Sequence, residues 1–193
     1  MRNILFIDIK TTGFDPSVNE VISCTIIDSN GDILLDSLVK PKNYIEFGSI
    51  PDFHEIEPET VDISGIEYSD LLKQIRKIVN NGYATYDTVV SYNLNFDLSF
   101  FPEELFSELN KICLMEMVFG YIQENPEFQN LSNFIKLSVA AFLFEINFLE
   151  LNLLSSYGDC ELTRRVWDHI SSDSEIFNST LKKYNEYKKT TKV

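Results

Sequence analysis

Three aspartates stand in sequence surroundings that could support metal chemistry. Asp8 lies at the end of a strongly apolar run, Asp97 follows a second short apolar run, and Asp159 lies at the start of a late helical pattern. Carboxylates placed at the ends of such elements can converge in space, and sites built from oxygen ligands alone suit Mg2+ or Mn2+. Two such ions, roughly 4 Å apart, clamp the attacking and leaving oxygens during phosphodiester cleavage. Taken singly, each aspartate is better explained by a helix cap or a solvated turn, so the case for a metal site rests on the three together.

The first aspartate requires a buried strand to position it. Residues 4–13 are almost continuously apolar up to Asp8 and Lys10 and end in a turn at Gly13, which predicts a buried central strand. Side chains alternate across a strand, so Asp8 and Lys10 point to the same face. Because an unpaired buried charge is very costly, either a metal cation or Lys10 itself must accompany Asp8.

The remaining pattern predicts strands and helices arranged around that first strand. Strands are expected at residues 18–28, 33–39, 88–92 and 111–115, with a hairpin turn at 29–32. Helices are expected at residues 69–79, 98–109, 117–123, 131–144, 158–170 and 174–189. Residues 40–65 are expected to be irregular, apart from a short helical turn at 52–56. No repeat or linker divides the chain, so residues 1–193 are expected to form a single domain that ends in a lysine-rich helix from about residue 174.

The composition describes a folded and strongly acidic protein. The chain has 193 residues, of which 44% are hydrophobic, and a net charge of −14. Residues 181–193 hold five lysines and one glutamate, so residues 1–180 carry −18, which does not suit a broad basic face for nucleic acid. Three well-separated cysteines, the absence of an apolar run of about 20 residues and the lack of a signal-peptide pattern indicate a cytoplasmic protein with reduced thiols and no membrane span.

The segments around the three aspartates resemble the three motifs of the DEDDh family of 3′–5′ exonucleases, which includes ribonuclease T and the proofreading subunits of bacterial polymerases. The first motif is similar to residues 6–14 (FIDIKTTGF), the second to residues 90–97 (VSYNLNFD) and the third to residues 156–163 (SYGDCELT). The segment that begins at His54 also resembles the loop before the first long helix of the family. The resemblance keeps the family's motif order and extends to about Trp167.

The resemblance implies a fold, an activity and a set of site residues. The fold would be α/β and ribonuclease H-like, with a mixed five-stranded sheet flanked by helices. The activity would remove nucleotides from a 3′ end with Mg2+ or Mn2+ held by Asp8, Asp97 and Asp159. The partner would be the 3′ end of a single strand or a nucleotide, and dimerisation, which is frequent in the family, carries over as an expected homodimer. The residues around that end would be Thr11, Thr12, Gly13, Phe14, His54, Asn93 and Phe96.

The sequence departs from the family's pattern at two positions that carry chemistry. Lys10 stands where the first motif has its second acid, and Leu154 stands where the family has a histidine that activates the attacking water. The tyrosine of the family's other variant is also missing, since that position is Ser155. Losing a general base costs roughly 10²–10⁴-fold in rate, and two unit charges about 4 Å apart interact by roughly 4 kcal/mol near a protein surface. Because a divalent ion carries two charges, the Lys10 ammonium would repel it about twice as strongly as it would repel a monovalent ion.

We therefore hypothesise that the Lys10 ammonium takes the place of the metal ions. It would pair with Asp8 and with one of the two other aspartates, and Mg2+ or Mn2+ would then bind weakly, singly or not at all. Glu150 and His54 are the nearby residues considered for restoring the lost chemistry, whereas Glu161 should point away along its helix.

Three functions remain open at this point. The first is an exonuclease-fold protein that binds a nucleic acid end or a nucleotide, with hydrolysis weakened or lost. The second is a non-catalytic partner-binding subunit or inhibitor that uses the acidic surface, in its extreme form by mimicking nucleic acid charge. The third is a working nuclease with an unusual single-metal site. The lysines of residues 182–192 are either a solvated helix face or a clamp on a phosphate backbone.

Overall fold

The centre of the fold is a six-stranded mixed sheet. The computed structural model describes residues 3–42, 54–80, 86–123, 135–172, 177–178 and 181–182. Within these residues the strand order is β4-β3-β2-β1-β5-β6. The strands are β1 Ile4–Thr11, β2 Val21–Asp28, β3 Ile33–Lys40, β4 Ile66–Glu67, β5 Thr88–Ser91 and β6 Asn110–Cys113. The expected mixed α/β sheet is confirmed, and the two-residue β4 adds a sixth strand to the five expected.

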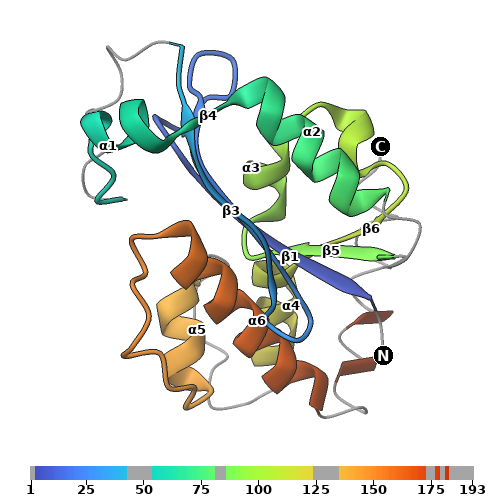
Figure 1. Ribbon diagram of the computed structural model, residues 1–193. Coiled ribbons are helices and arrows are strands. Elements are labelled where there is room, and N and C mark those ends of the chain that lie inside the picture. The colour runs from blue at the N-terminus through green and yellow to red at the C-terminus, as the bar shows by residue number, and fades with distance from the viewer. Residues whose placement is uncertain are drawn as a thin grey trace.

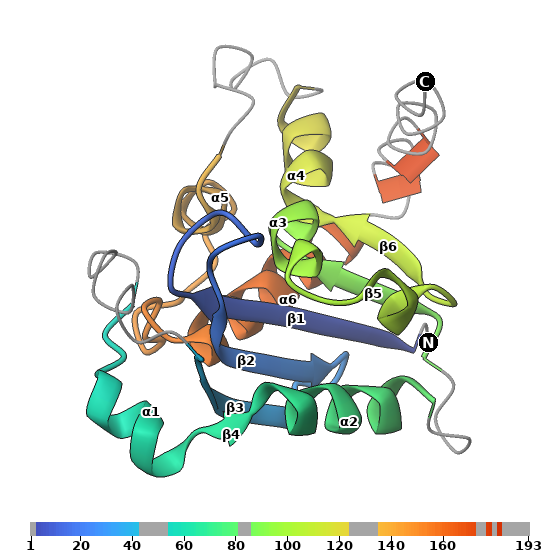
Figure 2. The same ribbon diagram turned by 90° about the horizontal axis from the view of Figure 1, so that it is seen from above.

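Helices cover both faces of this sheet. They are α1 Pro58–Ser64, α2 Tyr68–Val79, α3 Leu94–Ser99, α4 Leu114–Gln123, α5 Leu137–Leu143 and α6 Ser156–Ser172. Figure 1 shows the sheet nearly edge-on, with α2 and α3 over one face and α4, α5 and α6 over the other. In Figure 2 the strands are seen from above, with α2 in front of them and α6 behind β1 and β2, against which it packs.

Strand β1 organises the sheet because it has a neighbour on each side and a helix layer on each face. It pairs antiparallel with β2 and parallel with β5. Leu5, Phe6 and Ile7 are fully buried, as the apolar run predicts for a central strand. The hairpin that joins β2 to β3 also agrees with the sequence: the Asp28 amide donates to the Asp32 carbonyl at 3.0 Å, across a turn that the sequence places at residues 29–32.

The helix expected at residues 98–109 is wrong. Helix α3 ends at Ser99, and a separate 3₁₀ helix follows at Glu103–Phe106. Pro102 causes the break, because a proline disfavours helical backbone in the residue before it. The consequence for the site is that α3 is a short, independent element placed directly after β5.

The expectation of an irregular segment at residues 40–65 is also wrong in part. Pro58 starts α1 in its first turn, where a proline loses no hydrogen bond. Residues 54–57 are not helical, and residues 52–53 of the expected turn lie outside the described part of the chain. The helix expected from residue 131 begins at Leu137, and residues 131–134 likewise lie outside the described part.

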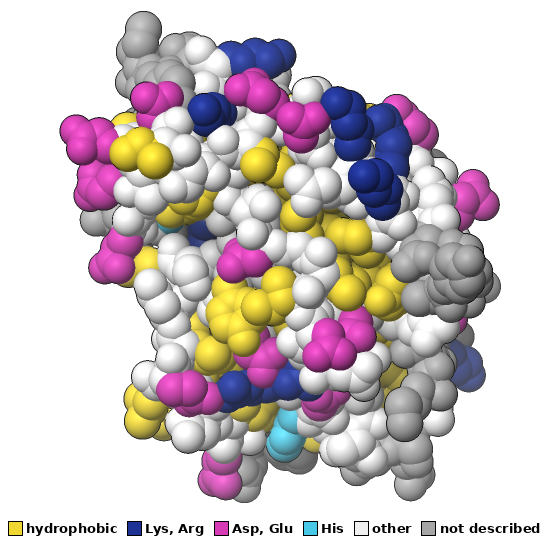
Figure 3. Space-filling model, in the orientation of Figure 1, with side chains coloured by type: hydrophobic (Ala, Val, Ile, Leu, Met, Phe, Trp, Pro, Cys, Tyr) yellow, Lys and Arg dark blue, Asp and Glu magenta, His cyan; other side chains and the backbone are white. Residues whose placement is uncertain are grey.

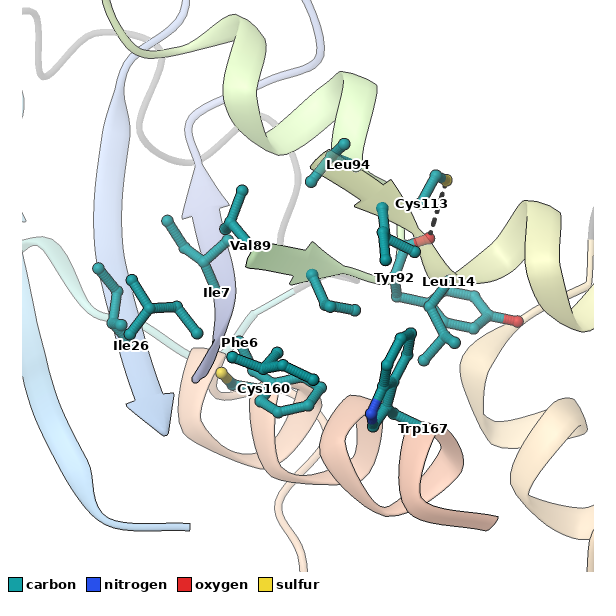
Figure 4. Close-up of a cluster of buried hydrophobic side chains, with 14 of the residues drawn as sticks. Phe6, Ile7, Ile26, Val89, Tyr92, Leu94, Cys113, Leu114, Cys160 and Trp167 are labelled. Carbon is teal, nitrogen blue, oxygen red and sulfur yellow. Dashed lines mark hydrogen bonds between the residues drawn. The ribbon is translucent and has the colours of Figure 1, made fainter. Parts of the chain in front are cut away.

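A buried apolar cluster joins the sheet to the helices beneath it (Figure 4). The rings of Phe6 and Trp167 meet edge-to-face with centroids 6.3 Å apart, and the Cys113 thiol donates to the Tyr92 carbonyl at 3.4 Å. All three cysteines are buried and unbridged, as expected for reduced thiols. Most of the expected lysine-rich helix lies outside the described residues, although Phe177 packs against Trp167 with ring centroids 5.3 Å apart. No helix in the described ranges is long and apolar enough to span a membrane.

Candidate active site

The three aspartates line one cleft of about 500 Å3. Asp8 comes from β1, Asp97 from α3 and Asp159 from the first turn of α6. The sheet brings them together because β1 and β5 are parallel neighbours whose carboxyl ends meet at the same edge, and α3 begins directly after β5. Asp8 and Asp159, which are 151 positions apart in the chain, therefore share one hollow.

Local contacts hold the second and third aspartates in place. Ser91, the last residue of β5, donates its hydroxyl to the Asp97 carboxylate and so ties α3 to the strand. The start of α6 depends on Gly158, because a Cβ atom there would lie 2.0 Å from the Asn152 carbonyl oxygen. The Gly158 amide donates to Ser155 Oγ at 3.0 Å, which fixes the first turn of the helix and with it the third aspartate.

The Lys10 ammonium lies between two of the carboxylates. Its Nζ atom is 3.2 Å from Asp8 Oδ2, and it donates to Asp159 Oδ2 as well. The Lys10 side chain is only 10% exposed, so this is a largely buried ion-paired group. The structure thus confirms that Lys10 accompanies Asp8, and it identifies Asp159 as the second partner.

Burial changes the titration of this whole cluster. Burial raises the pKa of Asp8 and that of Asp159 above their ordinary values, against the opposing charge of Lys10. Burial also raises the pKa of Asp97 to about 7, against the hydrogen bond from Ser91 and the charge of Lys10. Burial alone would lower the pKa of Lys10, but the charges of Asp8 and Asp159 outweigh it and hold that pKa above its usual value. At neutral pH the cleft therefore holds a charged lysine beside carboxyls that keep protons more readily than usual.

The donor groups, arranged as they are, do not fit a pair of divalent ions. Lys10 occupies the space between two carboxylates, and Ser91 engages the third. Among the described residues, no group of three or more His, Cys, Asp or Glu side chains has an arrangement that could hold a metal ion. A divalent ion would have to displace the ammonium before it could share these oxygens.

The position that would carry a general base is apolar. Leu154 lines the cleft beside Asp159 and has no atom that can accept a proton. His54 lines the cleft too, and its Nδ1 accepts the Ile56 amide at 3.3 Å, which places the proton of the neutral ring on Nε2. Burial and the nearby Lys10 charge both lower the pKa of His54, so the ring is a weak base.

Glu150, which was considered as a replacement, and Glu161, which was expected to point away, both pair with arginines. Glu161 is buried against α6's own arginines and accepts from Arg164 and Arg165, each at 2.8 Å. Glu150 forms an ion pair with Arg165 at 2.6 Å. Neither lines the cleft, and Glu161 points away from it as its helical spacing predicts.

Five of the seven residues expected around a 3′ end line this cleft: Thr11, Phe14, His54, Asn93 and Phe96. Phe14 is 62% exposed, and its ring centroid lies 6.2 Å from that of Phe96. Thr12 and Gly13 do not line the cleft. They hold the turn after β1, where the Thr12 amide donates to the Glu20 carbonyl at 2.9 Å and Thr11 Oγ1 donates to the Gly13 carbonyl at 2.7 Å.

The structure adds a cleft residue that the sequence pattern did not single out. Lys136 lines the cleft just before α5, is exposed, and forms no ion pair with a described residue. The sequence suggested only a mid-helix lysine here, because the helix was expected to begin at residue 131. No sequence signal marks Lys136, because its place at the cleft depends on the helix start at Leu137.

The fold matches that of solved structures of exonuclease I, and the mixed α/β sheet flanked by helices agrees with the expected fold. The solved structures that match include E. coli exonuclease I in a zinc-ion-bound complex with single-stranded DNA, at TM-score 0.74 and 14% identity. They also include E. coli exonuclease I with a dA16 oligonucleotide, at TM-score 0.71 and 14% identity, and a complex of exonuclease I with SSB-Ct, at 0.71 and 13%.

These matches cover 93% of this chain but only 42% to 43% of exonuclease I, so the chain spans less than half of that protein's length. At such low identity the likeness establishes the fold. No protein-family description matches the chain, and no curated protein matches it by sequence.

Proposed function

We propose that this chain is a DEDDh-like exonuclease-fold protein that binds a nucleic acid 3′ end or a nucleotide, with metal-dependent hydrolysis weakened or lost. The observation that carries the proposal is the Lys10 ammonium, which lies between Asp8 and Asp159 at the centre of the cleft. In the family that the sequence resembles, this position is an acid that helps to hold divalent ions. An ammonium there supplies the positive charge itself and repels any second cation.

The absence of a base at Leu154 supports the same conclusion independently. Water attack on a phosphodiester needs a group that takes the water's proton, and a leucine at the expected position cannot do so. The two substitutions therefore act on different parts of the reaction, the charge stabilisation and the proton transfer. Their combined effect exceeds the roughly 10²–10⁴-fold that loss of a general base costs alone.

Binding has its own support in the cleft walls. Phe14 and Phe96 offer ring faces on which bases can stack, and Thr11 and Asn93 offer hydrogen-bonding groups beside them. Lys136 supplies a cation that no described carboxylate neutralises. E. coli exonuclease I, whose fold this chain shares, is known in complexes with single-stranded DNA.

The decisive experiment compares the wild type with Lys10→Glu/Leu154→His on a 5′-labelled single strand, with Mg2+ or Mn2+. We expect 3′-end shortening in the double variant only, and its loss when Asp8→Asn is added. Each single variant should be far less active than the double. Chelator-sensitive shortening by the wild type at an ordinary enzymatic rate would contradict the proposal.

The net charge favours one alternative, a non-catalytic partner-binding subunit or inhibitor. A charge of −14 over 193 residues gives a surface that suits a basic site on another protein. The two functions differ in their ligand. Salt-dependent binding of an oligonucleotide with a 3′ overhang supports the first, and its absence down to low salt supports the second.

A further inference from the structure

A second hollow, of about 320 Å3, lies next to the candidate active site. It is lined on one side by the turn after β1, through Pro16 and Asn19, and on the other by the end of α3, through Phe100. The same turn and the same helix form a wall of the cleft, through Phe14 and Phe96. The two hollows therefore share one wall, and a chain lying in the cleft can continue over it into the second.

A row of aromatic rings connects the two hollows. The ring centroids of Phe14 and Phe96 are 6.2 Å apart, and those of Phe96 and Phe100 are 5.1 Å apart. Exposure falls along the row, from 62% at Phe14 to 8% at Phe100. The Tyr68 hydroxyl donates to the Phe100 carbonyl at 2.6 Å and so fixes the inner end of the row. Every nucleobase has a π-face, so such a row accepts bases regardless of their sequence.

The second hollow is also lined by two lysines. Lys40, the last residue of β3, and the exposed Lys42 both line it. Neither forms an ion pair with a described residue, although the Glu20 carboxylate lines the same hollow. Two ammonium groups that form no ion pair with a described carboxylate, placed beside this row of tilted and edge-to-face rings, match the alternating phosphates and bases of a single strand.

We propose that this second hollow holds the backbone of the single strand whose 3′ end lies in the cleft, with Lys40 and Lys42 on its phosphates. This inference rests on the proposed function and extends it by making the ligand a strand of several nucleotides. The exposed ring of Phe14 and the partly exposed ring of Phe96 carry the bases across the shared wall, and the buried ring of Phe100 packs against Phe96. The protein then prefers a strand to a mononucleotide and tolerates any base sequence.

The test measures affinity against strand length by fluorescence anisotropy, with unlabelled ligands as competitors. The ligands are a nucleoside 5′-monophosphate and thymidine oligomers of two, four and eight nucleotides. We expect affinity to rise with length in the wild type. Lys40→Gln/Lys42→Gln should weaken octamer binding roughly tenfold at low salt, reduce the slope of log affinity against log salt by about 1.4, and leave the monophosphate unchanged.

A matched control removes two cations from another part of the surface. Arg76→Gln/Lys77→Gln changes two exposed residues in the last turn of α2, where Lys and Arg side chains gather on the face shown in Figure 3. This pair should leave the length dependence intact. Because a Cβ on Gly65 would lie 3.1 Å from Lys40 Cγ, the Lys40 stem is packed, so Lys42→Gln alone provides a variant that cannot disturb that contact.

The outcomes separate this inference from the function on which it rests. An octamer that binds no better than the monophosphate overturns the strand path and leaves the nucleotide cleft standing. Equal weakening by the control pair and by the Lys40/Lys42 pair overturns it too, since binding would then follow overall charge. Absence of binding by every ligand contradicts the proposed function itself.

Discussion

Replacing Lys10 by methionine tests the central ion pair, because methionine keeps most of the apolar stem and removes the ammonium. Asp8 and Asp159 then lose their shared counter-ion in a site where the lysine side chain is 10% exposed. At 3.2 Å, and with an effective dielectric constant of about 20, the Lys10–Asp8 attraction amounts to roughly 5 kcal/mol. Desolvation offsets part of this, and one-sided loss of a buried pair typically costs about 3–5 kcal/mol.

We therefore expect Lys10→Met to lower the free energy of unfolding by about 3–5 kcal/mol at pH 8. The loss should be smaller at pH 5, because burial raises the pKa of both Asp8 and Asp159 and a falling pH favours the neutral form of carboxyls that have lost their counter-ion. Urea unfolding followed by the fluorescence of the single tryptophan, Trp167, measures both values. Lys73→Met is the matched control, since the Lys73–Asp70 pair is exposed on α2 and its loss should change little.

Lys10→Met should also bind a divalent ion at the place that the ammonium occupies in the wild type. With the ammonium gone, the carboxylates can share a divalent ion, and Mn2+ at 100 times its dissociation constant would restore about 2.7 kcal/mol. The wild type should gain almost nothing, and adding Asp8→Asn to Lys10→Met should abolish the gain. The reasoning is refuted if Mn2+ stabilises the wild type as much as the variant, or if Lys10→Met unfolds at the wild-type urea concentration.

Three further predictions follow from the site and its supports. Asp97 has a folded-state pKa of about 7 against an ordinary 3.8, so the folded protein keeps this proton over a pH range in which the unfolded chain has released it. The stability that the proton contributes is complete below pH 3.8 and is lost as the pH rises through 7. The stability of Asp97→Asn relative to the wild type should therefore rise by roughly 2–3 kcal/mol from pH 5 to pH 8 in urea unfolding, and a constant difference would contradict this. Gly158→Ala should lower the free energy of unfolding by about 1–3 kcal/mol, because the new Cβ would lie 2.0 Å from the Asn152 carbonyl oxygen. This holds even though alanine favours helices, and a rise in melting temperature would instead show that the start of α6 can shift. Glu161→Gln should lower the free energy of unfolding by roughly 1–3 kcal/mol, because it weakens the ion pairs with Arg164 and Arg165. It should leave oligonucleotide affinity unchanged, because Glu161 does not line the cleft.

The contacts of Lys10 with Asp8 could be predicted because they depend on local geometry. Alternation along one strand places both side chains on one face, and an unpaired buried charge must find a partner. Convergence of Asp97 and Asp159 on the same cleft is different, since it depends on a parallel β1–β5 pairing that no spacing within the sequence specifies. Only the resemblance of the surrounding motifs suggested it.

The elements that were missed depend on long-range contacts. Strand β4 has two residues and forms only because Ile66 pairs in parallel with Val39 across the end of the sheet. Helix α1 precedes it and buries a single residue, Val61, so its seven positions show little helical periodicity. Lys136 was missed for a related reason, because its place at the cleft depends on where α5 begins.

The charges in the cleft suggest how such a fold can remain stable without divalent ions. Three carboxylates in one buried hollow repel one another, and a fold of this kind needs positive charge among them. Here one fixed ammonium lies between Asp8 and Asp159, and burial raises the pKa of the third carboxyl, Asp97, to about 7, so that it keeps a proton more readily than a free carboxyl does. The lysine and the proton thus both reduce the negative charge of the cluster. The cations that attract a phosphate backbone must then lie outside this cluster, as Lys136, Lys40 and Lys42 do.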